Sequence, residues 1–263
     1  MSLRRFFIHP TDITGKTAIL TGSEAHHLRT VLRLTPGAPI TFFDGTGTRY
    51  QARIEQILKD RVTATIIEQT RDLEPKVCLH LGQALLKGQK MDLILQKATE
   101  LGVNAIWPFS SEHGIHKPQR ETQLDRWQRI VLEACKQCDR AKPPEIHDTR
   151  EITDLMAHPP PCDMRLIFWE HETRQTLHEA LAAQDKDCRS AFFLLGPEGG
   201  FSENEVACAQ KEGFTPVSLG PRILRAETAT LTATAILQFS LGNLDPIQPK
   251  IHEEIPCAPL SKG

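Results

Sequence analysis

The sequence predicts an α/β protein in which a small β-barrel precedes a larger domain built on a parallel sheet. Residues 1–73 contain many short strand patterns and one helix, an arrangement typical of a small barrel. From Lys76 onward strand patterns alternate with helical ones, which indicates a parallel sheet with helices on its faces. The length of 263 residues exceeds the usual size of one hydrophobic core, so two domains are expected.

The first domain is expected to consist of short strands joined by turns, one of them at Thr46-Gly47. The predicted strands cover residues 5–8, 17–20, 39–43, 49–58 and 61–68. One short helix is expected over residues 24–32, with Ser23 as its N-cap and Pro36-Gly37 closing it. Glu74-Pro75 then serves as the linker.

The second domain is expected over residues 76–243. Its predicted strands cover residues 77–83, 105–108, 165–169, 191–195 and 216–219. Its predicted helices cover residues 91–101, 125–138, 177–183, 203–212 and 227–241. Residues 246–263 contain four prolines and little apolar material, so this tail is expected to be disordered.

Composition excludes several classes of protein. The chain is 40% hydrophobic and 24% charged, as is usual for soluble globular proteins, and no apolar run is long enough to cross a bilayer. Residues 1–10 lack the sustained apolar core of a secretion signal, so we expect a cytoplasmic protein. The seven cysteines are odd in number and scattered, which favours free thiols. Cys135 and Cys138 have the spacing of half a zinc site, but no second pair follows, so no metal is expected.

Charge is distributed unevenly along the chain. The net charge of −2 excludes a protein that coats nucleic acid through bulk positive charge. Residues 1–72 nevertheless hold ten Lys and Arg against seven Asp and Glu, an excess of three. An arginine-rich face on this domain could hold phosphate groups, and an ordinary solvated surface accounts for the same excess.

A glycine-rich loop is the most informative local feature. Residues 191–195 form an apolar strand pattern, which ends in Gly196-Pro197-Glu198-Gly199-Gly200 before a helix begins. Ser202 and Glu205 have the spacing of a capping box at the start of that helix. Glycines at the carboxyl end of a strand let a ligand approach the backbone, at the sheet edge where ligands usually bind. The loop lacks the spacing of a P-loop or a dinucleotide fingerprint, and a tight turn without a ligand is the alternative.

A second strand, turn and helix follows at residues 216–235. Arg222, Arg225 and Glu227 lie close together at a turn after Gly220-Pro221. The helix that follows is made largely of Ala and Thr, and such small residues allow close packing, which indicates a buried helix. The alternative is that Glu227 only complements the helix dipole while the arginines are solvated.

These two stretches resemble the RsmE family of 16S ribosomal RNA uridine-N3 methyltransferases, which belongs to the SPOUT class. The resemblance rests on Leu-Leu-Gly-Pro-Glu-Gly-Gly-Phe at residues 194–201 and on Leu-Gly-x-Arg-Ile-Leu-Arg-x-Glu-Thr-Ala at residues 219–229. Lys-Ala-Thr-Glu-Leu-Gly at residues 97–102 and Arg-Arg-Phe-Phe at residues 4–7 also agree. The resemblance extends over about residues 1–243, and the tail lies beyond it.

The resemblance implies a PUA-like RNA-binding barrel followed by a SPOUT domain with a C-terminal trefoil knot. It also implies a homodimer that uses S-adenosylmethionine to methylate 16S ribosomal RNA in the small ribosomal subunit. The implied cofactor loops lie around residues 168–170, 195–200 and 219–226. The cofactor-binding residues within them are Phe168, Glu170, Leu195, Gly196, Pro197, Gly199, Gly200, Leu219, Gly220, Ile223, Leu224 and Ala226. The residues expected to hold RNA phosphates are Arg4, Arg29, Arg33, Lys87, Lys90 and Arg140.

Methylation of uracil N3 requires loss of a proton from the Watson–Crick edge, so the base must be unpaired. The resulting anion spreads onto the carbonyl oxygens, where a guanidinium would stabilise it, and Arg225 is the first candidate. Glu227 and Glu198 are both candidates for a general base, and the residues alone do not choose between them. Two other functions remain open: a SPOUT enzyme with another target, such as a ribose 2′-hydroxyl, and an RNA-binding protein without catalytic activity.

Overall fold

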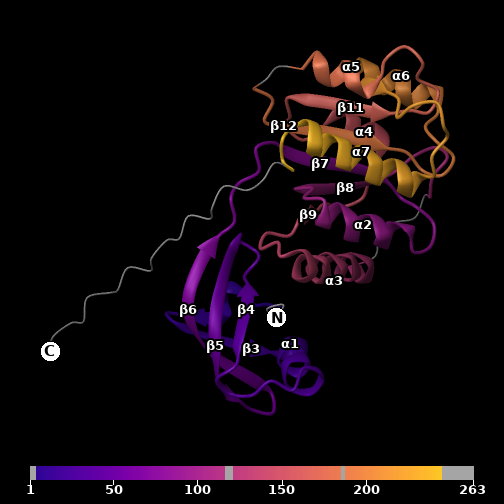
Figure 1. The fold of residues 1–263 in the computed structure, drawn as a ribbon. Helices are drawn as coiled ribbons and strands as arrows, with labels where there is room; N and C mark the ends of the chain where they lie inside the picture. Colours follow the sequence, from indigo (N-terminus) through magenta and orange to yellow (C-terminus); the bar gives the residue numbers. More distant parts are fainter. Residues whose placement is uncertain (1–3, 116–120, 185–186, 245–263) are drawn as a thin grey trace. The chain divides into compact units, whose positions relative to one another are not determined.

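The computed structural model describes residues 4–115, 121–184 and 187–244, which form two compact units (Figure 1). Within these residues, the first unit comprises residues 4–74 and 135–143, and the second comprises residues 75–134 and 144–244. The tail predicted at residues 246–263 lies outside the described residues. None of the described helices is both long and apolar enough to span a membrane.

The first unit is built on a six-stranded sheet with the order β1-β4-β5-β6-β3-β2. Its strands are β1 (Arg5–Phe7), β2 (Ile13–Thr14), β3 (Thr17–Thr21), β4 (Pro39–Phe43), β5 (Thr48–Ile57) and β6 (Arg61–Arg71). The pair β1 and β4 is parallel, and the other pairs are antiparallel. Alternate residues of β6, namely Val62, Ala64 and Ile66, are buried in the core of this unit, as the period of two in a strand requires. The five predicted strands are confirmed, and closure into a barrel stays a prediction.

The helix predicted in this unit is present but begins earlier than expected. The helix α1 (Gly22–His26) continues as one π-helical turn over His27–Val31. Thr21 occupies the N-cap position and makes no side-chain cap bond, so Ser23 lies inside the first turn and its predicted capping role is wrong. A short 3₁₀ turn at Pro10–Asp12 was not predicted.

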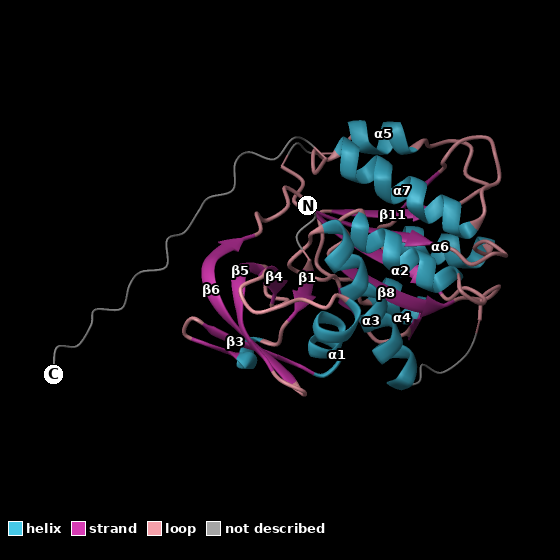
Figure 2. Ribbon diagram, turned by 60° about the horizontal axis from the view of Figure 1, so that its bottom comes forward, coloured by secondary structure: helices cyan, strands magenta, loops and turns pink. Residues whose placement is uncertain are grey.

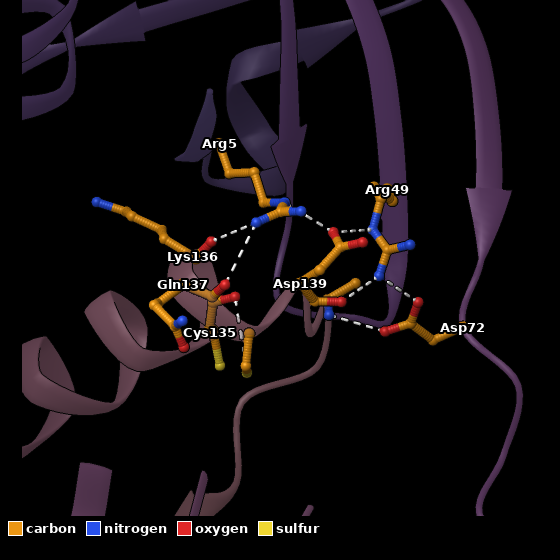
Figure 3. A network of polar contacts seen from close by, with 9 residues as sticks. Arg5, Arg49, Asp72, Cys135, Lys136, Gln137 and Asp139 are labelled. Carbon is orange, nitrogen blue, oxygen red and sulfur yellow. Dashed lines mark hydrogen bonds and ion pairs between the residues drawn. The ribbon is translucent and has the colours of Figure 1, made fainter. Parts of the chain in front are cut away.

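Residues 135–143 belong with the first unit, although the sequence places them in the second domain. A polar network explains this (Figure 3). Asp139 lies 2.9 Å from Nε of Arg5 and 3.3 Å from Nε of Arg49, while Asp72 lies 2.7 Å from Nη2 of Arg49. The other carboxylate oxygen of Asp72 accepts the backbone N–H of Ala141 at 2.7 Å. The network joins residues that are distant in sequence, so local patterns could not reveal it.

The second unit is built on a parallel sheet with the order β10-β8-β7-β12-β11-β13, and β9 also pairs with β8. Its strands are β7 (Cys78–Ala84), β8 (Ala105–Ser110), β9 (Glu145–Ile146), β10 (Arg150–Glu151), β11 (Met164–Phe168), β12 (Ser190–Leu195) and β13 (Thr215–Val217). All pairs are parallel, so the predicted parallel sheet is confirmed. The short strands β9 and β10 were not predicted.

The helices of the second unit lie beside this sheet (Figure 2). They are α2 (Lys90–Glu100), α3 (Glu121–Cys138), α4 (Ile152–Ala157), α5 (Leu177–Ala182), α6 (Glu203–Lys211) and α7 (Ala226–Ser240), and the last residues of α3 group with the first unit. Helix α2 packs on α7, and α4 packs on α6. All predicted helices are confirmed, whereas the six-residue α4 was not predicted.

The register of three strands decides where the functional loops lie. Phe168 at the end of β11 pairs with Leu195 at the end of β12 and with Val217 at the end of β13. Because these strands are parallel, the loops that follow them leave the sheet at the same edge. Segments around residues 169, 196 and 218 therefore come together although they are far apart in sequence.

Candidate functional site

A pocket of about 360 Å³ opens at this edge of the second unit. Its walls come from the loops after β11, β12 and β13, from the start of α7 and from the first residue of α2. The lining residues are Lys90, Phe168, Trp169, Glu170, Leu195, Gly196, Pro197, Glu198, Gly200, Ser218, Leu219, Gly220, Arg222, Ile223, Leu224, Arg225, Ala226 and Ala229. A volume of this size suits a small organic ligand.

The loop after β12 is fixed by the helix that follows it. Ser202 accepts the N–H of Glu205 at 3.2 Å, and Glu205 accepts the N–H of Ser202 at 2.9 Å, which confirms the predicted capping box. The second carboxylate oxygen of Glu205 accepts the N–H of Glu112 at 2.8 Å, and Glu205 is buried. One buried carboxylate therefore holds both the start of α6 and the loop after β8.

Two glycines in this loop are required by close packing. Gly200 has φ +72°, and a Cβ there would lie 1.9 Å from Oε1 of Glu170, which is itself part of the pocket wall. At Gly199 a Cβ would lie 2.8 Å from Cβ of His113. The loop therefore contacts the segments after β11 and β8 at distances that only glycine permits.

The loop after β13 places two arginines at the start of α7. The Ser218 hydroxyl accepts the N–H of Gly220 at 3.1 Å, and Arg225 occupies the N-cap position of the helix. Arg222 and Arg225 are exposed, and neither guanidinium group forms a hydrogen bond or ion pair with another residue in the described part of the chain. Ile223 between them is 86% exposed, which is unusual for a large apolar side chain. This stretch thus presents both cationic and apolar groups to a ligand.

The predicted cofactor residues are brought together by the fold. All of them except Gly199 line the pocket, and Gly199 packs against His113 behind it. Trp169, which lies within the first of the three predicted loops, also lines the pocket. Ser218 and Ala229 line it as well but lie outside the predicted loops. Ser218 directly precedes Leu219, so extending the third loop by one residue would have found it.

Lys90 occupies a different position from the one expected of an RNA ligand. Its Nζ lies 3.0 Å from Oε1 of Glu198 and 3.6 Å from Oε2 of Glu227. Burial alone would raise the pKa of Glu198, but hydrogen bonds from its own backbone, from Lys90 and from the N–H of Lys87 outweigh burial and lower that pKa. A carboxylate with a lowered pKa is a weak base, which disfavours Glu198 as the general base.

Glu227 is not one of the residues that line the pocket, although Arg225 and Ala226 before it are. Its Oε2 is buried, makes no hydrogen bond to any described residue and faces the ammonium group of Lys90. A buried oxygen that faces a lysine cannot readily reach a substrate. The geometry therefore favours an indirect role for Glu227 over the direct catalytic role considered from the sequence.

The remaining predicted RNA ligands differ in accessibility. Arg4, Arg33 and Lys87 are exposed, and Arg29 is half-buried. Arg4 donates a hydrogen bond to the carbonyl of Leu32, and Arg29 donates one to that of Lys59. Arg140 is partly buried, so it is less accessible to phosphate than the three exposed residues, and burial lowers its pKa. Arg5 and Arg49 are held in the ion-pair network of the first unit and do not contribute to an arginine-rich face.

Cys135 and Cys138, which have the spacing of half a zinc site, lie at the end of α3. No group of three His, Cys, Asp or Glu residues with metal-ligand geometry occurs within the described ranges. Cys135 is fully buried, and burial raises the pKa of its thiol to about 12. The protonated thiol packs as a small apolar group.

Two family models match this chain. A family described as an RNA methyltransferase domain matches residues 73–238, and one described as an RNA methyltransferase PUA domain matches residues 20–67. The ribosomal RNA small subunit methyltransferase E of Bacillus subtilis is 29% identical, with 90% of this chain and 96% of that protein covered. Its counterpart in Buchnera aphidicola subsp. Schizaphis graminum is 32% identical, with 86% of this chain and 91% of that protein covered.

Solved structures with a similar fold contain the same cofactor. The ribosomal RNA small subunit methyltransferase E of Neisseria gonorrhoeae, bound to S-adenosylmethionine, has a TM-score of 0.81 and 35% identity, with 90% of this chain and 97% of that chain covered. A methyltransferase structure from Legionella pneumophila with bound cofactor SAM has a TM-score of 0.82 and 30% identity, with 91% of this chain and 98% of that chain covered.

Proposed function

Because this chain belongs to the RsmE family of ribosomal RNA small subunit methyltransferases, we propose that it transfers a methyl group from S-adenosylmethionine to N3 of a uridine in 16S ribosomal RNA. The observation that carries the proposal is the convergence of three loops, two of them glycine-containing, on one pocket at the edge of a parallel sheet. Two relatives with the same fold hold S-adenosylmethionine in their structures.

The size and lining of the pocket support its assignment to this cofactor. Glycine at position 200 leaves no side chain between the loop backbone and the pocket, and a Cβ at Gly220 would meet nothing within 4 Å. The backbone groups of residues 195–200 and 219–226 would hold the cofactor, with Phe168 and Ile223 providing apolar walls. Bound there, S-adenosylmethionine supplies an electrophilic methyl group on a sulfonium centre.

Arg225 is the residue that we assign to the reacting base. It lines the pocket, is exposed and is not engaged by another described residue, so its guanidinium is available to a substrate. Donation to a carbonyl oxygen of uracil would stabilise the N3 anion and thereby lower the pKa of N3. Water can then accept the N3 proton, since Glu198 is already hydrogen-bonded and the buried Oε2 of Glu227 faces Lys90. Alignment of N3 with the methyl donor supplies further rate enhancement.

The RNA and a second copy of the chain are the partners that follow from this function. Arg4, Arg29, Arg33 and Lys87 would hold phosphates of the small-subunit RNA.

The exposed apolar residues Ile236, Phe239 and Leu244, on and just after α7, support a homodimer in which a second copy covers them. The strand order β7-β12-β11 together with the family resemblance supports the trefoil knot and the PUA-like barrel. Such an enzyme would act in the cytoplasm.

Product analysis tests the proposed reaction. Small ribosomal subunits from a strain that lacks the enzyme are incubated with the protein and labelled S-adenosylmethionine, and the nucleosides are separated. Label in 3-methyluridine supports the proposal, whereas label in a 2′-O-methyl nucleoside identifies a SPOUT enzyme with another target. If calorimetry detects no binding of S-adenosylmethionine and no label is transferred, the result favours an RNA-binding protein without catalytic activity.

A further inference from the structure

Lys90 connects three segments at the pocket. It is the first residue of α2, while Glu198 lies in the glycine-rich loop after β12 and Glu227 lies in the first turn of α7. One ammonium group lies 3.0 Å from the first carboxylate and 3.6 Å from the second. The backbone N–H of Lys87 also donates to Glu198 at 3.3 Å, so the segment before α2 holds this loop at two points.

Glu227 depends on Lys90 for its counter-charge. It is the only charged residue in α7, and its side chain is 17% exposed. The helix N-terminus favours a negative charge at this position, but Oε2 has no hydrogen-bond donor among the described residues. Removal of Lys90 would leave a largely buried carboxylate without a cation, which is unfavourable. The first turn of α7, which directly follows Arg225, is therefore held in place partly by Lys90.

These ion pairs matter more for geometry than for overall stability. The hydrogen bond to Glu198 raises the pKa of Lys90, so the ammonium group stays charged at neutral pH. Lys90 and Glu198 are 37% and 30% exposed, and pairs that are this accessible to water contribute little to the stability of a fold. Their effect falls on the relative position of the segments that they join.

We propose that Lys90 is a positioning residue for methyl transfer, which acts through Glu198 and Glu227 to hold the cofactor loop against the turn that carries Arg225. The inference rests on the proposed function. The positioning role of Lys90 replaces the phosphate contact expected from the sequence, because its ammonium group is already held by two carboxylates beside the pocket.

The test compares Lys90→Met with Lys97→Met. Lys97 lies on the same helix, is 38% exposed and pairs with Glu100 at 2.9 Å, but it does not line the pocket. Lys90→Met is expected to lower kcat by about tenfold while KM for RNA stays within about twofold, in the range of coupling between contacting residues. Lys97→Met is expected to leave both values near those of the wild type. Addition of Glu227→Gln to Lys90→Met is expected to recover part of the lost kcat, because it removes the unpaired carboxylate.

Other outcomes overturn the inference. If Lys90→Met raises KM for RNA and weakens the salt dependence of binding while kcat holds, Lys90 is a phosphate ligand. Equal effects of Lys90→Met and Lys97→Met, or no recovery in the double variant, also exclude the positioning role.

Amide hydrogen exchange tests the same contacts without relying on turnover. Lys90→Met is expected to increase exchange both in residues 196–200 and in residues 226–230, and unchanged exchange in either segment refutes the inference. If the wild-type protein transfers no methyl group, the proposed function fails, and hydrogen exchange still decides whether Lys90 joins the segments.

Discussion

Gly200→Ala tests how tightly the cofactor loop packs against Glu170. The added Cβ would lie 1.9 Å from Oε1 of Glu170, and the backbone at position 200 has φ +72°. The left-handed conformation costs a residue with a Cβ about 1–2 kcal/mol. For a domain of this size, each kcal/mol lowers Tm by about 2–4 °C. The Glu170 carboxylate must also move, and because it lines the pocket, we expect affinity for S-adenosylmethionine to fall by about tenfold or more, equivalent to about 1.4 kcal/mol.

Gly15→Ala provides the matched control for this substitution. Gly15 has φ +59°, and a Cβ there would meet nothing within 4 Å. Gly15→Ala therefore introduces the same backbone strain as Gly200→Ala but no close contact. It lies in the first unit and outside the pocket. Thermal melting should show similar losses for the two variants, while calorimetry with S-adenosylmethionine should show weaker binding for Gly200→Ala alone. Equal cofactor affinity in the two variants would refute the assigned packing of this loop.

Three further predictions address the reaction, the pocket and the first unit. Arg225→Ala should abolish methyl transfer while cofactor affinity stays within about tenfold, or 1.4 kcal/mol, and unchanged turnover would remove Arg225 from the chemistry. Because Trp169 lines the pocket, cofactor binding should change tryptophan fluorescence, and Trp169→Phe should remove most of this change although Trp107 and Trp127 remain; a full response in the variant would place the cofactor elsewhere. Burial and the hydrogen bond to Asp44 raise the pKa of Tyr50, the single tyrosine, to about 12. The contribution of the neutral phenol to folding stability is therefore complete below its ordinary pKa of about 10 and is lost as pH rises towards 12. Tyrosinate absorbance that titrates near pH 10 in the folded protein would contradict this.

The features that the sequence predicted well are those with local causes. The capping box at Ser202 and Glu205 and the apolar strand before Gly196 depend on neighbouring residues, and the structure contains both. The meeting of the loops after β11, β12 and β13 was expected from the family resemblance, and the parallel register of these strands accounts for it.

The features that the sequence missed depend on contacts between distant segments. Residues 135–143 group with the first unit because Arg5 and Arg49 form ion pairs with Asp139 and Asp72. No local sequence pattern predicts which residues form such pairs. Lys90 likewise resembles a surface lysine in the sequence, and only the fold brings it between Glu198 and Glu227. Charge alone predicts that a residue can bind an anion, but the tertiary structure decides which anion it meets.

A crystal structure of the protein with S-adenosylmethionine tests the central claim most directly. The account predicts that the cofactor lies between residues 195–200 and 219–226, with Trp169 and Glu170 beside it and its methyl group accessible to a base held by Arg225. Cofactor bound at another site, or an empty pocket at saturating concentration, would contradict it.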